Sequence, residues 1–362
     1  MVSTSYPKNQ QDWSGRFIYN LAEALARQPE LGLRIWAPPG SLPIAVSSAA
    51  SHDESRWLQA LSSQGGIAHL LRQGSIHGLR WGLSLVWHLH RAYRREQQCD
   101  LVHVNWLQNA IPLLGTQKPL VVSVLGSDMR LLRLPGITPL LRHVFKQRKT
   151  IITPNADWMI APLKEKFGDV AEIHFVSFGV DQVWFDIARA PVQPAIWIAV
   201  TRITEKKIGT LFKWGEELFG EQRQLHLFGP MQEALELPPW VHYHGPTHPQ
   251  ELIQNWFPNA TGLITLSQHD EGRPQVMLEA MAAGLPIVAS DLPAHRDFIR
   301  HKETGWLTKT KYETLDGLEW LEQPASNSLV GLAAQHWVKS SVGTWGDCAA
   351  RYTALYHRLL VP

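Results

Sequence analysis

The stretch DEGRPQVMLEAMAAGLPIVAS, residues 270–290, predicts a helix that leads directly into a strand. Apolar side chains recur at helical spacing at Val276, Met277 and Ala280, and the alanines that follow are good helix formers. Gly284 stands where a left-handed C-terminal cap belongs, and a proline two residues later is typical of a helix stop. The final letters, PIVAS, indicate a short buried strand.

Two carboxylates flank the start of this helix, Glu271 in the preceding loop and Glu279 inside the helix. Pro274 suits a first helical turn, so the helix is expected to open over residues 272–275, where free N–H groups and the helix dipole favour an anion such as a diphosphate. Gly272 would let that ligand approach closely. Glu279 is then expected to accept hydrogen bonds from vicinal hydroxyls, as a ribose offers, and Glu271 to meet sugar hydroxyls or a developing positive charge. The alternative is that Glu279 is a solvated residue of the helix and that Glu271 only complements the helix dipole.

The composition is that of a folded chain of about two domains, with 362 residues, 44% apolar and 18% charged. Its two cysteines do not make a disulfide framework, which favours a reducing compartment. The sequence contains no apolar run of about 18 residues and no basic start followed by an apolar core, so neither a transmembrane helix nor a signal peptide is expected.

Charge is distributed unevenly along the chain. Residues 1–175 contain 19 Lys and Arg against 12 Asp and Glu, whereas the remainder contains 15 against 20. A basic half and an acidic half predict two domains with different partners, and the basic half suits anionic lipid, nucleic acid or a phosphorylated ligand. Nucleic acid is the weakest of these, because no helix-turn-helix, zinc-finger or RNA-binding signature occurs.

Short apolar strands alternate with longer helical patterns, first through LRIWAP, DLVHVNW and PLVVSVLG and again through IWIAVTRI, QLHLFG and TGLITLS. This alternation predicts an α/β protein with two Rossmann-like, doubly wound domains that face a central cleft. The segment IARAPVQPA lacks periodicity and carries two prolines, so it is interpreted as a linker. The expected division is an N-terminal domain at 1–186, a linker at 187–195, a C-terminal domain at 196–343 and a last helix at 344–362 that returns to the first domain.

Several nucleotide and metal motifs are missing from the sequence. There is no G-x-G-x-x-G after the first strand and no P-loop, which argues against a dinucleotide dehydrogenase and a P-loop nucleotidase. Cationic side chains do follow the first strand of the second series, in AVTRITEKKIG. Arg202 stands just past the strand and offers a bidentate fork for phosphate, and Lys207 adds a point charge five residues later. Both are expected to reach the strand-end edge that carries the helix of residues 270–290.

These segments resemble the C-terminal domain of the retaining glycosyltransferases of family 4, which have the GT-B fold. The family's Glu-x7-Glu pattern falls on Glu271 and Glu279, and its Arg-x4-Lys pair falls on Arg202 and Lys207. SFGVDQVWF is similar to the family's hinge motif. DWSGRF and LVVSVLGSD resemble the glycine loop and the His-Gly-x-Asp strand of its N-terminal domain.

The resemblance implies a UDP- or GDP-linked sugar as donor, with no metal and no other cofactor. Transfer in such enzymes is thought to proceed by front-face attack, with the donor's β-phosphate taking the acceptor proton. It implies Arg202, Lys207 and Glu271 as catalytic residues. The donor-binding residues that it implies are Gly15, Ser127, Asp128, Arg202, Lys207, Gly272, Arg273, Pro274, Gln275, Val276 and Glu279.

Two features depart from the family pattern. Leu125 occupies the position of the family's histidine, and the glycine loop is reduced to Ser14 followed by a single Gly15. Asp128 and His103 are candidates to replace the missing sugar contact, although His103 lies within the strand pattern LVHVNW and is better interpreted as a packed strand residue.

The basic first half is expected to meet the acceptor. Residues 70–97 mix Arg72, Arg80, Arg91, Arg94 and Arg95 with Trp81, Leu85, Trp87 and Leu89. A basic amphipathic helix with tryptophan suits an anionic membrane, and a surface helix with its apolar face in the core is the equal alternative.

The leading hypothesis is therefore a cytoplasmic, metal-independent glycosyltransferase of polysaccharide or glycolipid biosynthesis, active on a saccharide or a lipid-linked acceptor, with peripheral contact at the inner membrane face kept open. Two alternatives remain. One is a GT-B epimerase or phosphorylase, and the other is a non-catalytic GT-B subunit that binds nucleotide sugar.

Overall fold

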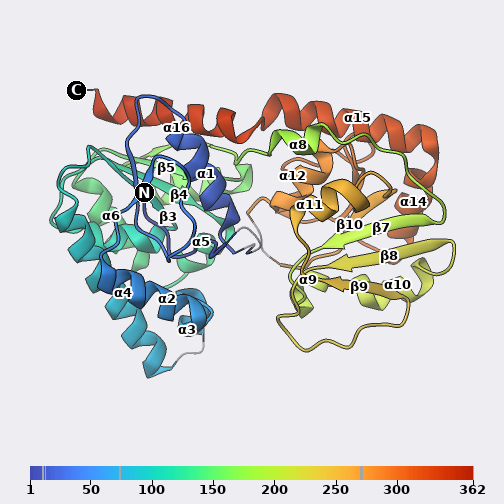
Figure 1. Ribbon diagram of the computed structural model, residues 1–362, viewed down its shortest axis with the longest axis horizontal. Helices are drawn as coiled ribbons and strands as arrows, with labels where there is room; N and C mark the ends of the chain where they lie inside the picture. Colours follow the sequence, from blue (N-terminus) through green and yellow to red (C-terminus); the bar gives the residue numbers. More distant parts are fainter. Residues whose placement is uncertain (10–11, 13, 73–74, 270–271, 362) are drawn as a thin grey trace. The chain divides into compact units, whose positions relative to one another are not determined.

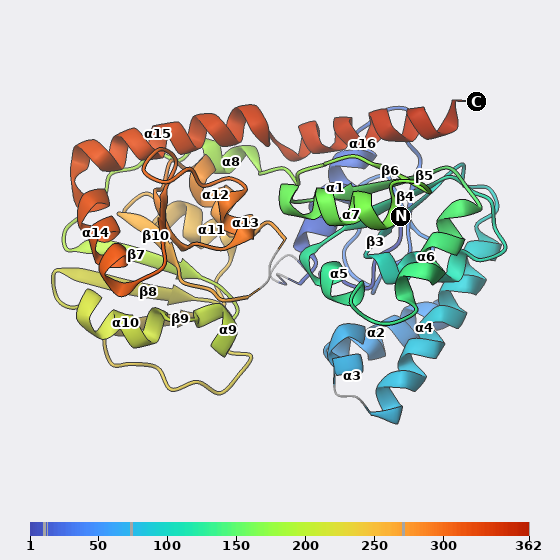
Figure 2. The same cartoon turned by 180° about the vertical axis from the view of Figure 1, so that it is seen from behind.

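The computed structural model describes residues 1–9, 12, 14–72, 75–269 and 272–361, with only the backbone at 68 and 72. The chain forms two compact units (Figures 1 and 2). Unit 1 comprises Met1–Phe178 and Trp345–Pro362, and unit 2 comprises Gly179–Thr344. Each unit has parallel strands between helices, so the predicted α/β fold with two Rossmann-like units is confirmed.

Unit 1 alternates short strands and helices. Its strands are β1 (Leu33–Ile35), β2 (Val46–Ser48), β3 (Val102–Asn105), β4 (Leu120–Val124), β5 (Thr150–Pro154) and β6 (Glu172–Ile173). Its helices are α1 (Arg16–Ala26), α2 (His52–Ser63), α3 (Ile67–Arg72), α4 (Ile76–Arg95), η1 (Leu107–Leu113), α5 (Gly126–Leu131), α6 (Ile137–Lys146), η2 (Asp157–Met159), α7 (Ile160–Phe167) and α16 (Trp345–Leu360).

The first residues of the chain join the strands of unit 1. β3, β4, β5 and β6 form a parallel sheet in that order, and β1 pairs with β2. Val2 bridges Trp36, directly after β1, and Val104 in β3. The chain start thus lies centrally, with connections leaving to either side, as in a doubly wound domain.

All five residues of β4 are buried, but successive side chains belong to core clusters on opposite faces of the sheet, so unit 1 has three layers. Leu120 and Val122 pack with α2, α3, α4 and α6, whereas Val121 packs with α1 and α16. Alternation of side chains along a strand accounts for helices on both faces of the sheet.

A buried polar network attaches α16 to the sheet of unit 1. Tyr356 Oη and His103 Nδ1 lie 2.6 Å apart, His103 Nε2 and Ser123 Oγ 2.8 Å, and Tyr352 Oη and Ser123 Oγ 2.6 Å. Burial lowers the pKa of His103 to about 3, so the ring is neutral and fits a role in packing rather than ligand binding.

Unit 2 contains a single parallel sheet. Its strands are β7 (Ala195–Val200), β8 (Arg223–Phe228), β9 (Val241–Gly245), β10 (Gly262–Thr265), β11 (Ile287–Ser290) and β12 (Trp306–Thr308), in the order β12-β11-β10-β7-β8-β9. Its helices are α8 (Gln182–Phe185), α9 (Glu205–Ile208), α10 (Leu211–Leu218), α11 (Pro249–Glu251), η3 (Leu252–Trp256), α12 (Gln275–Ala282), α13 (Pro293–Arg296), α14 (Lys311–Glu322) and α15 (Pro324–Ser341).

Alternate side chains again separate the two helical layers. Along β7, Ile198 packs with α12 and α15, while Trp197 packs with α9, α10 and α14. The predicted strand PIVAS is confirmed as β11, and the predicted left-handed glycine is confirmed at Gly284, which has φ 67° and follows the C-cap residue of α12, Ala283.

The segment expected as a linker, 187–195, lies inside unit 2. Arg189 donates hydrogen bonds to the carbonyl oxygens of Gly284 and Ala260, and its guanidinium is largely desolvated. The backbone N–H of Ala190 donates to Pro258. The chain instead passes from unit 1 to unit 2 at Phe178–Gly179 and returns at Thr344–Trp345.

Across the described residues, no helix combines the length and apolar character that crossing a bilayer requires.

Candidate functional site

The sheet of unit 2 has a topological switch point between β7 and β10. These strands are neighbours, but β7 is followed by β8 on one side and β10 by β11 on the other. The helices that follow them accordingly pack on opposite faces, α9 and α10 on one and α12 on the other. Ligands of doubly wound domains bind at the carboxyl ends of strands at such a point.

The loop after β7 brings the predicted cations to this edge. Arg202 is exposed just after β7, and Lys207 lies in α9, half-buried. The loop is held against the end of β10, where the N–H of Gln268 donates to Lys206 O over 2.8 Å. Gly209 makes this approach feasible, because its φ is 57° and a Cβ there would collide with Leu266 O.

The start of α12 is held by the segment that enters unit 2. The helix begins at Gln275, and Pro274 is its N-cap residue rather than part of the first turn. Gln275 donates from Nε2 to Gly179 O over 2.8 Å, and Val180 packs into the same core as α12. Asp181 follows, exposed and electrostatically coupled to Glu279. The part of the motif SFGVDQVWF that belongs to unit 2, residues 179–185, therefore packs on the predicted anion-binding helix, and Asp181 is a site carboxylate that sequence reasoning did not select.

Glu279 lies one turn into α12 with an unusual electrostatic setting. The pKa of its carboxyl is raised to about 8, mainly by desolvation and in part by the charge of Asp181, while a hydrogen bond with Gln275 opposes the shift. The alternative of an ordinary solvated helix carboxylate does not fit this setting. A group of this kind, at a strand-end switch point, is typical of a ligand site.

The other predicted residues around α12 differ in their surroundings. Arg273 is buried, with its guanidinium carbon 5.7 Å from the centroid of the Phe298 ring. Val276 packs partly against the core, so its backbone N–H is the group it can offer to a ligand. Gly272 is half-buried beside them. Glu271 lies outside the described residues.

Three predicted donor-binding residues belong to unit 1 and are described there. Gly15 is the N-cap of α1, with φ 70° and the backbone of Ser5 and Tyr6 against its α-carbon. Ser127 is exposed in α5, after β4. Ser127 follows the carboxyl end of β4, the edge at which such domains bind ligands, whereas Gly15 precedes the first strand and follows the chain start that bridges at Val2.

The side chain of Asp128 is buried and hydrogen-bonded to the backbone of unit 1. It is 1% exposed, and its two carboxylate oxygens accept the N–H groups of Leu125 and Leu107 at 2.8 and 2.9 Å. Desolvation raises the pKa of Asp128 to about 7, against these two hydrogen bonds. The side chain therefore joins the loops after β3 and β4 and offers neither oxygen to a sugar.

The residue at the family's histidine position is part of the core. Leu125 is 9% exposed and packs in the cluster that contains Val121, Phe178 and Trp345. His103 is also buried, as described above, so neither residue presents a polar group at the surface of unit 1.

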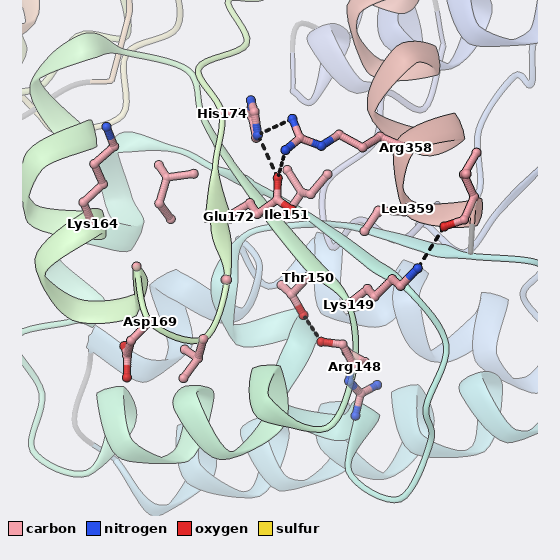
Figure 3. Close-up of a pocket in the computed structure, with 15 residues that line it drawn as sticks. Arg148, Lys149, Thr150, Ile151, Lys164, Asp169, Glu172, His174, Arg358 and Leu359 are labelled. Carbon is pink, nitrogen blue, oxygen red and sulfur yellow. Dashed lines mark hydrogen bonds and ion pairs between the residues drawn. The ribbon is translucent and has the colours of Figure 1, made fainter.

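A separate hollow of about 1220 Å³ lies where β5 and β6 begin, at the sheet edge opposite to the carboxyl ends (Figure 3). Several of the charged groups that Figure 3 shows around it are already engaged. Arg358 pairs with Glu172 at 2.7 Å and approaches His174, and Lys149 donates to the carbonyl oxygen of Val361. Its position and its paired charges distinguish this hollow from the switch-point site.

The fold is shared with solved glycosyltransferases of the GT-B class. Sucrose-phosphate synthase of Thermosynechococcus elongatus superposes with a TM-score of 0.69 at 15% identity, covering 99% of this chain and 98% of that one. A glycosyltransferase of Rickettsia africae gives 0.70 at 12% identity, with 95% and 94% covered. HepE of Anabaena, solved in complex with UDP-glucose, gives 0.66 at 13% identity, with 99% and 98% covered.

Sequence similarity is concentrated in unit 2. Residues 196–319 match the family of glycosyl transferases group 1. An exopolysaccharide phosphotransferase of Streptomyces coelicolor is 37% identical over 97 residues, which make up 26% of this chain and only 10% of that protein. The family match thus concerns unit 2, and the solved structures show that the whole chain shares their fold.

The raised pKa of Glu279 predicts a pH-dependent stability. The folded protein retains the Glu279 proton up to about pH 8, whereas the unfolded chain releases it near pH 4.5. The folded state therefore binds more protons within this window, so the free energy of unfolding falls as pH rises through it. The Glu279→Gln variant has no carboxyl group at this position, so its free energy of unfolding does not fall for this reason. The difference in the free energy of unfolding between the variant and the unmodified protein should therefore shift in favour of the variant across the window, by more than about 1.4 kcal/mol, the value of one pKa unit.

Urea denaturation at several pH values measures this difference. The Glu319→Gln variant is the matched control, because Glu319 is exposed on α14 in the same unit. An advantage of the Glu279→Gln variant that is independent of pH would show that Glu279 ionises normally.

Proposed function

We propose that this protein transfers a sugar from a nucleotide-diphosphate sugar to a saccharide or lipid-linked acceptor, with retention of configuration. The observation that carries this proposal is the convergence in unit 2 of two cations, Arg202 and Lys207, and the start of α12 at one strand-end switch point. Solved HepE, which has the same fold, holds UDP-glucose, and this favours UDP as the carrier.

The donor in this proposal lies across the switch point. Its diphosphate accepts hydrogen bonds from the backbone N–H groups at Gln275 and Val276, which are among the first four of α12 and have no partner within the helix. The ribose hydroxyls donate to Glu279, and this binding favours the ionised carboxylate over the protonated one. Asp181 is placed to share this task, being coupled to Glu279.

Catalysis in this proposal stabilises the leaving group. When the sugar–phosphate bond breaks, negative charge grows on the diphosphate and the sugar becomes oxocarbenium-like. Arg202 and Lys207 gain interaction energy as this charge develops, so they favour the transition state over the bound donor. The β-phosphate takes the acceptor proton in front-face attack, and Glu271 remains proposed as the carboxylate near the developing positive charge.

We also propose a cytoplasmic location and a role in polysaccharide or glycolipid synthesis. Both cysteines, Cys99 and Cys348, are free thiols, which supports a reducing compartment. The relative from Streptomyces coelicolor is named for exopolysaccharide chemistry, which supports a saccharide acceptor.

Nucleotide-sugar binding tests the proposal directly. A panel of UDP- and GDP-sugars should contain a donor that raises the melting temperature of the protein. Calorimetry with that donor should show binding weakened by about 1–3 kcal/mol in the Glu279→Ala variant, because the ribose hydroxyls lose a hydrogen-bond acceptor. The Glu319→Ala variant, altered at an exposed residue of α14, should bind normally.

Two results would contradict this assignment. Unchanged affinity in a folded Glu279→Ala variant would remove the ribose role, and a panel without any binder would remove the donor site. Slow donor hydrolysis without acceptor supports an enzyme, whereas tight binding without any turnover supports the alternative of a non-catalytic subunit.

Arg202→Ala and Lys207→Ala should lower kcat more than they raise the KM for the donor. The expected loss in rate is about a hundredfold or more, by analogy with the removal of one oxyanion-stabilising donor. Arg202→Lys should restore activity only partly, because an ammonium group cannot reproduce the bidentate fork.

Steady-state kinetics with the panel's best donor provide the measurement. Lys206→Ala is the matched control, since Lys206 is an exposed neighbour in α9. A steep rise in KM at constant kcat would mean that the two cations bind the donor without acting in the transition state.

Activity should persist after treatment with EDTA and should not require added Mg²⁺ or Mn²⁺. The reason is that two side-chain cations and the amide groups of α12 neutralise the diphosphate in this proposal. Loss of turnover on chelation, followed by recovery with either ion, would show that a divalent cation takes part.

A further inference from the structure

Helix α4 carries a continuous row of apolar side chains on its outside, which we call the outer row. Its members, with their exposed fractions, are Ile76 (73%), Leu79 (58%), Leu83 (63%), Val86 (40%) and Trp87 (53%). The spacing of three, four, three and one residues keeps them on one helical face. At 1.5 Å per residue the row is about 16 Å long.

The core of unit 1 does not account for the outer row. The opposite face of α4 already buries Leu85, Leu89 and Ala92 against α2 and η1. Trp81 is also turned inward and lies 5.4 Å from the ring of Trp57. The helix is therefore apolar on two faces, and among the described residues only one of these faces packs within unit 1. α2, α3 and α4 lie together there (Figure 1).

The charged residues of the sequence stretch that contains the outer row are of one sign. Between Glu54 and Glu96 the sequence contains six arginines and no Asp or Glu. Arg80, Arg91 and Arg94 are exposed on α4, and the guanidinium of Arg91 lies 4.6 Å from the ring centroid of Trp87.

The carboxylates that precede this stretch, on α2, are neutralised by other arginines. Asp53 pairs with Arg56 at 2.7 Å, and buried Glu54 pairs with Arg95 at 2.8 Å. The outer row thus lies in a region whose accessible charge is positive.

We propose that the outer row is a docking surface for an anionic lipid bilayer. A helix that lies in the membrane interface buries its apolar face about 5–10 Å deep, at the level of the headgroups and the first acyl carbons. Arg80, Arg91 and Arg94 then reach lipid phosphates, with their apolar stems along the same face. Trp87, with an apolar ring and a polar N–H, suits the headgroup level.

Charge argues against a second copy of the chain as the occupant. A twofold interface built on the outer row would place the same patch on both partners. Arginines would then face arginines with no carboxylate between them, which is unfavourable at an interface. An anionic bilayer satisfies both the apolar row and its arginines.

Flotation of the full chain with lipid vesicles tests the proposal. The protein should float with phosphatidylcholine vesicles that contain phosphatidylglycerol, and much less with phosphatidylcholine alone. The double variant Leu79→Glu/Leu83→Glu should reduce the partition by at least about tenfold, because two apolar anchors are lost and two repelled charges are gained. Arg80→Gln/Arg94→Gln should weaken both the binding and its sensitivity to salt.

The matched control is Leu329→Glu/Leu332→Glu, which alters two exposed leucines of α15. These variants should melt like the unmodified protein, since every substituted side chain is exposed, and the control should float normally. Failure of the unmodified chain to float with anionic vesicles, or an equal loss in the control, would overturn the proposal. So would a concentration-dependent dimer that Leu83→Glu abolishes, because it would identify a second copy as the occupant. None of these results depends on sugar transfer, so the test is separate from that of the proposed function.

Discussion

The site in unit 2 depends on one constraint, which is that β7 and β10 are neighbours in the sheet while their connections leave toward opposite faces. Had the two connections covered the same face, α9 and α12 would compete for the space above the strand ends. Because they diverge, the loop with Arg202 and the start of α12 both border the same edge. The close approach of Gly209 to the end of β10 then fixes how near the cations lie to it.

Much of this unit could be predicted from the sequence, because its local signals agree with its packing. The helix over 275–282, its cap at Gly284 and the strand β11 follow from periodicity and capping preferences that tertiary contacts do not override. The segment 187–195 could not be predicted in the same way. Its two prolines and lack of periodicity resemble a linker, whereas its attachment depends on Arg189, whose carbonyl partners lie far away in the sequence.

The residues of the candidate site also divide into those that could be selected from the sequence and those whose roles could not be predicted from it. Arg202, Lys207 and Glu279 were predicted from residue type and spacing, and the structure places the loop after β7 and the start of α12 at one sheet edge. The roles of Asp128 and Asp181 depend on which backbone and side-chain groups face them. Asp128 is occupied by two N–H groups from separate loops, and Asp181 gains its importance from Glu279, nearly a hundred residues later. Neither the pair of hydrogen bonds to Asp128 nor the coupling of Asp181 to Glu279 can be recognised in a short stretch of sequence. The same limit applies to α4, where apolar residues on two faces give one pattern, and only the packed structure separates the core face from the outer row.

The electrostatics of the switch point fit a ligand that carries two kinds of group. Asp181 and Glu279 disfavour each other's charge, and Glu279 holds its proton to about pH 8, so this part of the site has the greatest affinity for hydrogen-bond donors that can compensate an ionised carboxylate. Arg202 and Lys207, together with the amide groups of α12, instead attract negative charge. An inorganic anion would satisfy the second group and leave the first unmatched, and a simple sugar would do the reverse. A nucleoside diphosphate satisfies both, since its ribose hydroxyls and its phosphates are joined in one molecule, and this pairing is the physical reason to expect that neither half alone binds as well as the whole.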